Sequence, residues 1–242
     1  MQITFIDHSS FLIELENTIL LFDWYKGEIP PLNESKQIYV FSSHKHHDHF
    51  NIEIFEKLGN YSNVHYVLSR DIHLGVNYLE RNNINPSIKE KITFVGSNKT
   101  YEFGEEEKKI EVQTLTSTDA GVAFVVACEG RTFYHAGDLN WWSWPGEEFE
   151  EENQMEQDYT REIDKLKGLH IDIAFVALDP RQEERYWWGF DYFMRVVDAD
   201  KVFPMHCWGN YSIITMLKKE SCAIGYGDRI VTIERENQIF NI

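Results

Sequence analysis

The chain has 242 residues, which is within the range of one large layered domain. Apolar residues make up 43% of it and aromatic residues 14%, enough for a full core, so we do not expect a disordered protein. The formal net charge of −17 would repel DNA or RNA over most of the surface, so we expect no nucleic-acid partner.

The sequence also indicates the cellular compartment of the protein. No stretch of about 18 apolar residues occurs, so we expect no membrane partner. Residues 1–15 lack a basic head followed by a long apolar stretch, and we expect a first strand there rather than a signal peptide. Cys128, Cys207 and Cys222 form no close pair, which favours the reducing cytoplasm over a disulfide framework.

Apolar alternation and short buried runs predict strands along most of the chain. In chain order they lie at 3–6, 11–15, 18–22, 37–43, 64–69, 92–95, 109–115, 121–128, 131–135, 171–178, 201–206 and 229–234. Helical spacing of apolar residues predicts helices at 51–59, 71–81, 159–166 and 192–197. Asp71 is expected to cap the second of these helices. The acidic run from Gly146 to Asp158 is interpreted as a solvated loop or helix face.

No linker divides these elements, and each half of the chain runs strands first, then helices mixed with strands. We therefore predict a single domain over residues 1–242. Its fold class is α+β, with four layers in the order αββα, two mixed sheets packed face to face and helices outside.

The histidine-rich segment after the strand at 37–43 predicts a metal site. Residues i and i+2 of an extended segment point the same way, so His44 and His46 can share one ion. Asp48 and His49 follow as the chain turns into a helix, and can reach a second ion beside the first. Imidazole and carboxylate ligands suit zinc, with manganese and iron as alternatives.

A solvated histidine tract would lack a buried strand before it and partners elsewhere in the chain. Here two later strands end in suitable donors. The segment YHAGDLN carries Asp138, whose carboxylate could bridge two ions, and VFPMHCWG carries His206.

These motifs together carry a family resemblance. SHKHHDH, FYHAGD and PMH resemble the metallo-β-lactamase-fold hydrolase superfamily. The segments IDHSSFLIE and LLFDW look like the opening strands of its ascorbate-6-phosphate lactonase-like and phospholipase D-like branches. The motifs extend from about residue 3 to residue 208, so the resemblance covers most of the chain, and it implies the αββα fold.

The resemblance also implies ligand roles. His44 and His46 would hold the first of two divalent ions, and Asp138 would bridge them. The second ion would take the following ligands: Asp48, His49 and His206. Among these, Asp48 and His206 are the predicted catalytic residues.

One departure from the family pattern concerns the first ion. The family usually supplies a third histidine from a turn in mid-chain, and the corresponding segment 114–124 contains none. Asp119 is the best substitute, ahead of Ser117 and Thr118; a plain turn aspartate is the equal alternative. If Asp119 does not bind, a single ion is expected.

Four further polar residues have two readings each. His8 either lines the site or belongs to the core, and His135 either orients ligands from behind or is structural. Asp23 is either a partner of a ligand or a turn residue. Arg181 could pair with a substrate phosphate or carboxylate, or form a structural salt bridge. The tryptophans near the site segments either wall a pocket or bury core or a subunit interface.

The sequence therefore predicts a metal-dependent hydrolase of a small molecule, acting on an ester, lactone, amide or phosphodiester through hydroxide presented by the ions. The alternative is a non-catalytic metal-binding or regulatory domain with a degenerate first site. The acidic charge argues against a nuclease of the same fold. The diiron redox branch of this fold would normally carry an extra flavin-binding domain, for which these residues leave no room, so we do not expect a redox enzyme of that kind. A homo-oligomer is left open.

Overall fold

The computed structural model describes residues 1–105 and 109–242. Its strands are β1 (Gln2–Asp7), β2 (Ser10–Glu14), β3 (Thr18–Phe22), β4 (Gln37–Ser42), β5 (Val64–Ser69), β6 (Ile92–Val95), β7 (Thr100–Phe103), β8 (Ile110–Thr116), β9 (Val122–Cys128), β10 (Arg131–His135), β11 (His170–Ala177), β12 (Asp198–Met205) and β13 (Gln238–Asn241). They form two sheets, ordered β13-β1-β2-β3-β4-β5-β6 (sheet A) and β12-β11-β10-β9-β8-β7 (sheet B).

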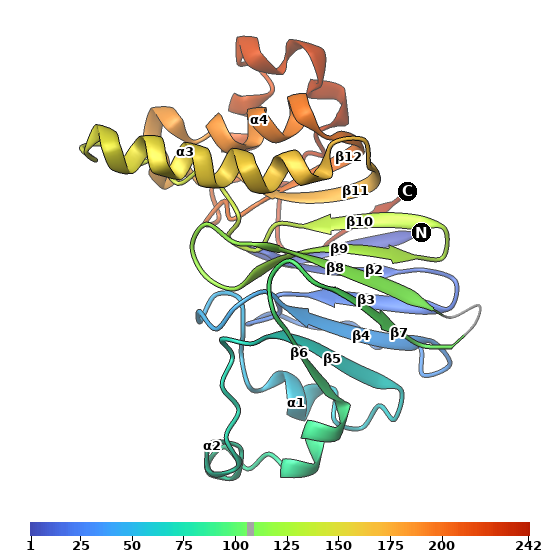
Figure 1. The fold of residues 1–242 in the computed structure, drawn as a ribbon. Helices are drawn as coiled ribbons and strands as arrows, with labels where there is room; N and C mark the ends of the chain where they lie inside the picture. The colour runs from blue at the N-terminus through green and yellow to red at the C-terminus, as the bar shows by residue number, and fades with distance from the viewer. Residues whose placement is uncertain (106–108) are drawn as a thin grey trace.

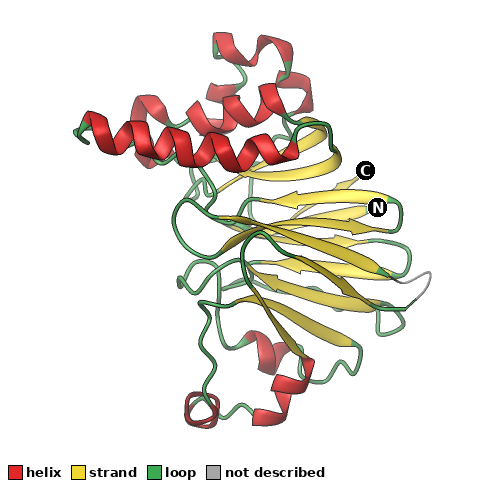
Figure 2. Cartoon of the chain, viewed as in Figure 1, coloured by secondary structure: helices red, strands yellow, loops and turns green. Residues whose placement is uncertain are grey.

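The helices cover the outer faces of this sandwich (Figures 1 and 2). They are α1 (Ile54–Lys57), α2 (Val76–Arg81), α3 (Phe149–Ile163), α4 (Trp188–Val196) and α5 (Ser212–Leu217). Short 3-10 helices lie at Pro86–Lys91, Asp164–Leu166, Pro180–Arg185, Ser221–Gly225 and Gly227–Arg229. No helix in the described part of the chain is long and apolar enough to cross a membrane.

Both sheets are mixed, as the sequence predicts. β1, β2 and β3 pair antiparallel, whereas β3, β4, β5 and β6 pair parallel. Sheet B repeats this plan, with antiparallel pairing from β7 to β10 and parallel pairing from β10 to β12. Parallel sheets are normally covered on both faces, which explains the continuous apolar runs in these strands.

Alternate residues of one strand serve two different cores. In β4, Tyr39 and Phe41 face the core between the sheets, and Ile38 and Val40 face the core beneath α1 and α2. On the other side, Phe190 and Phe193 of α4 extend the main core over sheet B. This arrangement confirms the predicted four-layer αββα, α+β fold.

Several element boundaries differ from prediction. The residues 229–234 form no strand; Ile230 makes only a single bridge to Val202, and the edge of sheet A is β13 instead. The helix predicted from Asp71 begins at Val76, and the Asp71 carboxylate accepts a hydrogen bond from the Lys45 backbone N–H at 3.1 Å. The acidic run forms most of α3, whose N-terminal end projects beyond the sandwich (Figure 1).

Candidate metal centre

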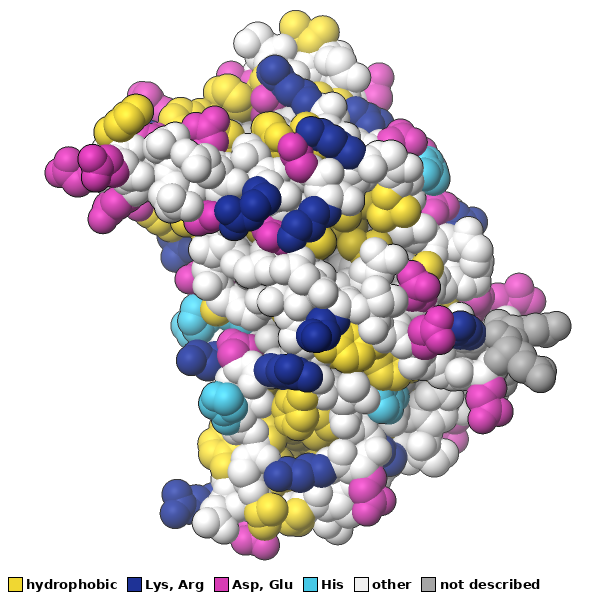
Figure 3. Space-filling view, in the orientation of Figure 1, with side chains coloured by type: hydrophobic (Ala, Val, Ile, Leu, Met, Phe, Trp, Pro, Cys, Tyr) yellow, Lys and Arg dark blue, Asp and Glu magenta, His cyan; other side chains and the backbone are white. Residues whose placement is uncertain are grey.

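The predicted ligands gather at the edge where the parallel strands end. The carboxyl ends of β3, β4, β10, β11 and β12 meet there, the usual position of sites in such sheets. The segment 44–49 follows β4, Asp138 follows β10 and His206 follows β12. Figure 3 shows histidine side chains at this edge, below the projecting acidic end of α3.

Two groups of donor atoms lie side by side. Within each group, one nitrogen or oxygen of every member lies within 4.8 Å of the others. The first group is His44, His46 and Asp138, and the second is His8, Asp48, His49 and His206. His8 thus lies with Asp48, His49 and His206, the residues expected to hold the second ion.

Asp138 connects the two groups through its two carboxylate oxygens. Its Oδ2 lies 3.3 Å from Nε2 of His44, in the first group. Its Oδ1 lies 3.1 Å from Nε2 of His49 and 3.4 Å from Nε2 of His206, in the second group. One carboxylate thus faces both groups at once, as a bridging ligand would.

A buried carboxylate fixes two of the histidine rings from behind. Asp23 is fully buried and accepts hydrogen bonds from His49 Nδ1 at 2.7 Å and from the Ser43 hydroxyl at 2.6 Å. Because the one hydroxyl hydrogen of Ser43 is donated to Asp23, Ser43 Oγ accepts from His44 Nδ1 at 2.9 Å. Both rings therefore have a proton on Nδ1 and turn Nε2 toward Asp138.

A second buried carboxylate does the same for His206. Asp179, fully buried at the end of β11, accepts a hydrogen bond from His206 Nδ1 at 2.9 Å. It also accepts from the Trp208 indole N–H at 3.2 Å and from the Arg181 guanidinium. Histidine ligands of metals commonly donate their other ring N–H to a carboxylate in this way.

The residues present fit a metal centre because their inward-facing atoms have no other partners. Nε2 of His8, His44, His49 and His206, and Oδ1 of Asp138, are buried and make no hydrogen bond within the described residues. Several unpaired buried polar atoms in one place are costly unless something binds them. A divalent cation suits this set of imidazole and carboxylate donors.

The pKa shifts of His49 and Asp138 also fit a site for a cation. Burial lowers the pKa of His49, but the negative charges of Asp138 and Asp23 outweigh it and hold that pKa well above the usual value. Burial raises the pKa of Asp138, yet the neighbouring His49, His44 and His206 hold it well below the usual value. The site is thus built around fixed carboxylate charge that favours a cation at its centre.

Asp119 lies beside the first group without joining it. Its Oδ2 is 3.7 Å from Nδ1 of His46, and half of its side chain is exposed. It does not come within ligand spacing of all three members of the first group. His47 belongs to neither group, and 92% of its side chain is exposed.

The two remaining histidines of the prediction have different surroundings. His8 lies inside the site, with Nε2 3.4 Å from Asp48 Oδ2 and its ring centroid 4.1 Å from that of His206. Burial lowers the pKa of His8 to about 4, so it is neutral and able to act as a ligand. His135 is behind the site: its ring donates to the Ser9 carbonyl at 2.9 Å and accepts from the Gly137 N–H at 3.1 Å.

A cavity of about 360 Å³ opens above the two groups. Its lining comprises His46, His47, Asp48, Thr118, Asp119, Asp138, Trp142, Trp144, Met155, Arg181, His206 and Trp208. Three tryptophans therefore wall the cavity, whereas Trp141 and Trp188 line a separate apolar hollow beside α3. Asp48, Asp138 and His206 face the cavity, and His44 and His49 lie beneath it, fully buried.

Some contributors were not assigned a role from the sequence. Asp179 and Ser43 orient rings from strands distant in the sequence, so no local motif marks them. The available signal for Asp179 was its position at the end of a buried strand on the same sheet edge.

Comparisons with known proteins agree with this geometry. A family model described as the beta-lactamase superfamily domain matches residues 2–149. The solved structure of Igni18, a metallo hydrolase from Ignicoccus hospitalis, is similar with a TM-score of 0.62 at 13% identity, covering 100% of this chain and 98% of its own. A putative metal-dependent hydrolase from Parabacteroides distasonis has a TM-score of 0.60 at 16% identity, covering 95% of this chain and 90% of its own.

A third similar structure is CmlA, a diiron β-hydroxylase from Streptomyces venezuelae. Its TM-score is 0.55 at 14% identity, and the match covers 85% of this chain and 44% of CmlA. At these identities the solved structures show a shared fold. The family model, which spans more than half of the sequence, shows the family as well. The chain belongs to the beta-lactamase superfamily and has the metallo-β-lactamase fold of metal-dependent hydrolases.

Proposed function

We propose that this protein is a hydrolase that uses two divalent cations to cleave an ester, lactone, amide or phosphodiester bond of a small molecule. The observation that carries the proposal is the carboxylate of Asp138, whose two oxygens face two different groups of metal-type donors. When bound, such ions would activate water and polarise a carbonyl or phosphoryl oxygen.

The position of each donor residue indicates which ion it would hold. His44, His46 and Asp138 would hold the first ion, and Asp119 could add an oxygen beside His46. Asp48, His49 and His206 would hold the second, with His8 close enough to join them. Asp48 and His206 also face the cavity, which supports the catalytic roles expected for them.

Zinc is the proposed metal because imidazoles and carboxylates at both groups suit it, with manganese and iron as the alternatives. The proposed substrate is a small molecule rather than a nucleic acid. The cavity of about 360 Å³ is of suitable size for one, and the net charge of −17 opposes polyanions.

The test is turnover by the metal-loaded protein of a panel of small esters, lactones, amides and phosphodiesters. We expect hydrolysis of at least one class, reduced at least about a hundredfold in Asp138→Ala and His49→Ala. His170→Ala is the matched control, because His170 is exposed on β11 and pairs with Asp198 at 2.9 Å. Equal activity in all three variants would overturn the proposal.

The alternative function is a metal-binding domain without catalysis, and one observation favours it. The first group has three donors and lacks the histidine that the family pattern places in the turn before β9. A metal-binding domain without catalysis would give stoichiometric metal with no turnover of any class in the panel.

A further inference from the structure

The cavity above the metal centre contains a feature that the metal chemistry does not use. Arg181 is the single arginine or lysine among the described residues that line it, and Trp142, Trp144 and Trp208 form its apolar walls. A cation among aromatic rings, in a chain of net charge −17, indicates a role in binding. The inference below rests on the proposed function, because it concerns the substrate of the same site.

Arg181 is held rigidly in the cavity wall. Its Nε donates to both carboxylate oxygens of Asp179 at 3.0 Å, and its Nη2 also donates to that carboxylate. The guanidinium carbon lies 4.4 Å from the ring centroid of Trp208 and 5.7 Å from that of Trp144. Because Asp179 is fully buried, the guanidinium cannot swing away without leaving that carboxylate less well paired.

The outer edge of the guanidinium remains available. Half of the Arg181 side chain is exposed, and within the described residues no group accepts a hydrogen bond from its Nη1. Arginine presents its N–H groups in a planar fork that matches the two oxygens of a carboxylate or phosphoryl group. A fork fixed on one side by Asp179 and lying over two indole rings is therefore preorganised for an oxyanion on the other side.

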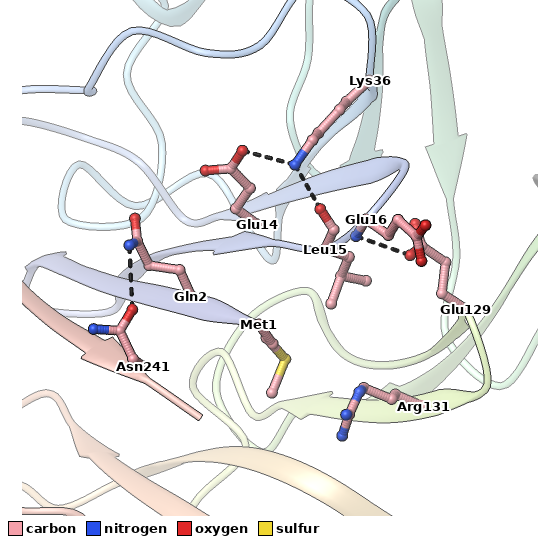
Figure 4. Close-up of a pocket in the computed structure, with 9 residues that line it drawn as sticks. All are labelled: Met1, Gln2, Glu14, Leu15, Glu16, Lys36, Glu129, Arg131 and Asn241. Carbon is pink, nitrogen blue, oxygen red and sulfur yellow. Dashed lines mark hydrogen bonds and ion pairs between the residues drawn. The ribbon is translucent and has the colours of Figure 1, made fainter.

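Basic residues in a hollow at the opposite edge of the sheets are arranged differently. A hollow of about 650 Å³ lies at the opposite ends of β1 and β10 (Figure 4). There Lys36 pairs with Glu14 at 2.7 Å, and Arg131 pairs with Asp172 at 3.3 Å on the surface. Neither lies against an aromatic ring of that lining, which contains none.

We propose that the substrate carries an oxyanion group, a carboxylate or a phosphoryl group, that Arg181 binds, next to a planar apolar group that lies against the three tryptophans. In the loaded site Arg181 and two divalent ions would carry five positive charges, which offset the five surrounding carboxylates: Asp23, Asp48, Asp119, Asp138 and Asp179. The local charge is then close to zero although the whole chain is acidic, so an anionic small molecule can bind there.

Binding of inert probes to the metal-loaded full chain tests this without turnover. The probes are phenylphosphonate and benzoate, which carry a ring and an oxyanion, and benzyl alcohol, which carries the ring alone; affinities are measured by calorimetry. We expect Arg181→Met to weaken one or both anionic probes by about tenfold or more and benzyl alcohol by less than about twofold. Loss for benzoate alone identifies a carboxylate, and loss for phenylphosphonate alone a phosphoryl group.

Arg131→Met is the matched control, with the same change of charge far from the site, and should leave all three affinities unchanged. Trp144→Leu should weaken phenylphosphonate and benzyl alcohol alike, because it removes the wall and keeps the Arg181–Asp179 pair. Anionic affinity that is the same in Arg181→Met as in wild type, or no binding of either anionic probe by wild type, overturns the proposal.

Metal content is measured for every variant, since Asp179 also orients His206. If Arg181→Met loses its metal, Arg181→Lys is measured in its place. Weaker binding of the anionic probes by Arg181→Lys with full metal content supports recognition by the planar guanidinium, and unchanged binding overturns the proposal. A chain that binds the anionic probes through Arg181 and hydrolyses nothing contradicts the proposed function alone.

Discussion

The buried carboxylate of Asp179 shows how much of this site depends on residues that would touch no metal. It accepts hydrogen bonds from His206, Trp208 and Arg181, so it sets a ligand ring, a cavity wall and a cation together. The neighbouring groups hold its pKa at about 2: burial raises the pKa, but His206 and Arg181 lower it by more. Asp179 therefore stays charged at neutral pH.

Asp179→Asn should weaken metal binding by about ten- to a hundredfold, because the amide no longer offers a charged acceptor to His206 Nδ1. Competition with a chromogenic chelator measures the change. Asp198→Asn makes the same chemical change at an exposed pair with His170 and should leave the affinity unchanged. Equal affinity in both variants and wild type would show that Asp179 does not support the metal.

The lowered pKa of His65, a residue outside the metal centre, predicts a small dependence of the free energy of unfolding on pH. It lies on β5 with Nε2 3.0 Å from Thr93 Oγ1, and burial lowers its pKa. The unfolded chain therefore takes up a proton on this residue at higher pH than the folded chain does. This contribution to stability is complete above the unfolded pKa of about 6.5, and is lost as the pH falls toward the folded pKa.

Between about pH 7.5 and about pH 5.5, the free energy of unfolding of wild type should therefore fall relative to that of His65→Gln, which has no group to titrate. Denaturant unfolding at each pH measures the difference. A constant difference over this range would contradict the lowered pKa.

At the scale of elements, the site depends on two turns that touch each other across the sheets. After β10 the chain turns at Gly137 with φ +52°, and a Cβ there would lie 2.6 Å from Ser43 Cβ at the end of β4. The next residue is Asp138, and Ser43 positions His44. Close approach of these turns therefore places the bridging carboxylate against the histidine segment.

Gly137→Ala should lower the free energy of unfolding by about 1–3 kcal/mol and reduce metal content, because strain and collision both displace Asp138. The control is Gly130→Ala at the other end of β10, where φ is +73° and, apart from its chain neighbours, no described atom lies within 4 Å of the added carbon. That variant should show a strain cost alone, with metal retained. Full metal content in Gly137→Ala would contradict the role of this turn.

Elements were predictable from the sequence where burial was regular. The parallel strands β4 and β11 are apolar throughout because both faces are covered, and they were predicted nearly to the residue. β13 was missed because its four residues alternate between half-buried and exposed. Most of α3 was missed because its first turns, from Phe149, are acidic and project from the sandwich, so no apolar stripe marks them.

The site was predictable to the extent that its donors follow strands within short motifs. The segment 44–49, Asp138 and His206 come together as expected. The choice between site and core for His8, and between partner and turn residue for Asp23, depended on packing between the sheets. That packing joins residues far apart in the sequence, and a single sequence carries no signal of it.

At the scale of the whole molecule, the donors of the candidate metal centre come from both sheets. His44, His46, Asp48 and His49 follow a strand of sheet A, whereas Asp138 and His206 follow strands of sheet B. Ions held by both sets would connect the halves of the sandwich at one edge, opposite the hollow between β1 and β10. The proposed chemistry therefore depends on the relative position of the sheets.

The most direct test is metal content per chain, by elemental analysis of protein purified without chelator or affinity tag. Wild type should hold about two divalent ions, and Asp138→Ala should hold at most one, because the carboxylate that faces both groups is gone. Asp119→Ala, measured alongside, shows whether the oxygen beside His46 is a ligand. Wild type that holds no ion even after incubation with zinc, manganese or iron would contradict the metal centre, and with it the proposed hydrolase.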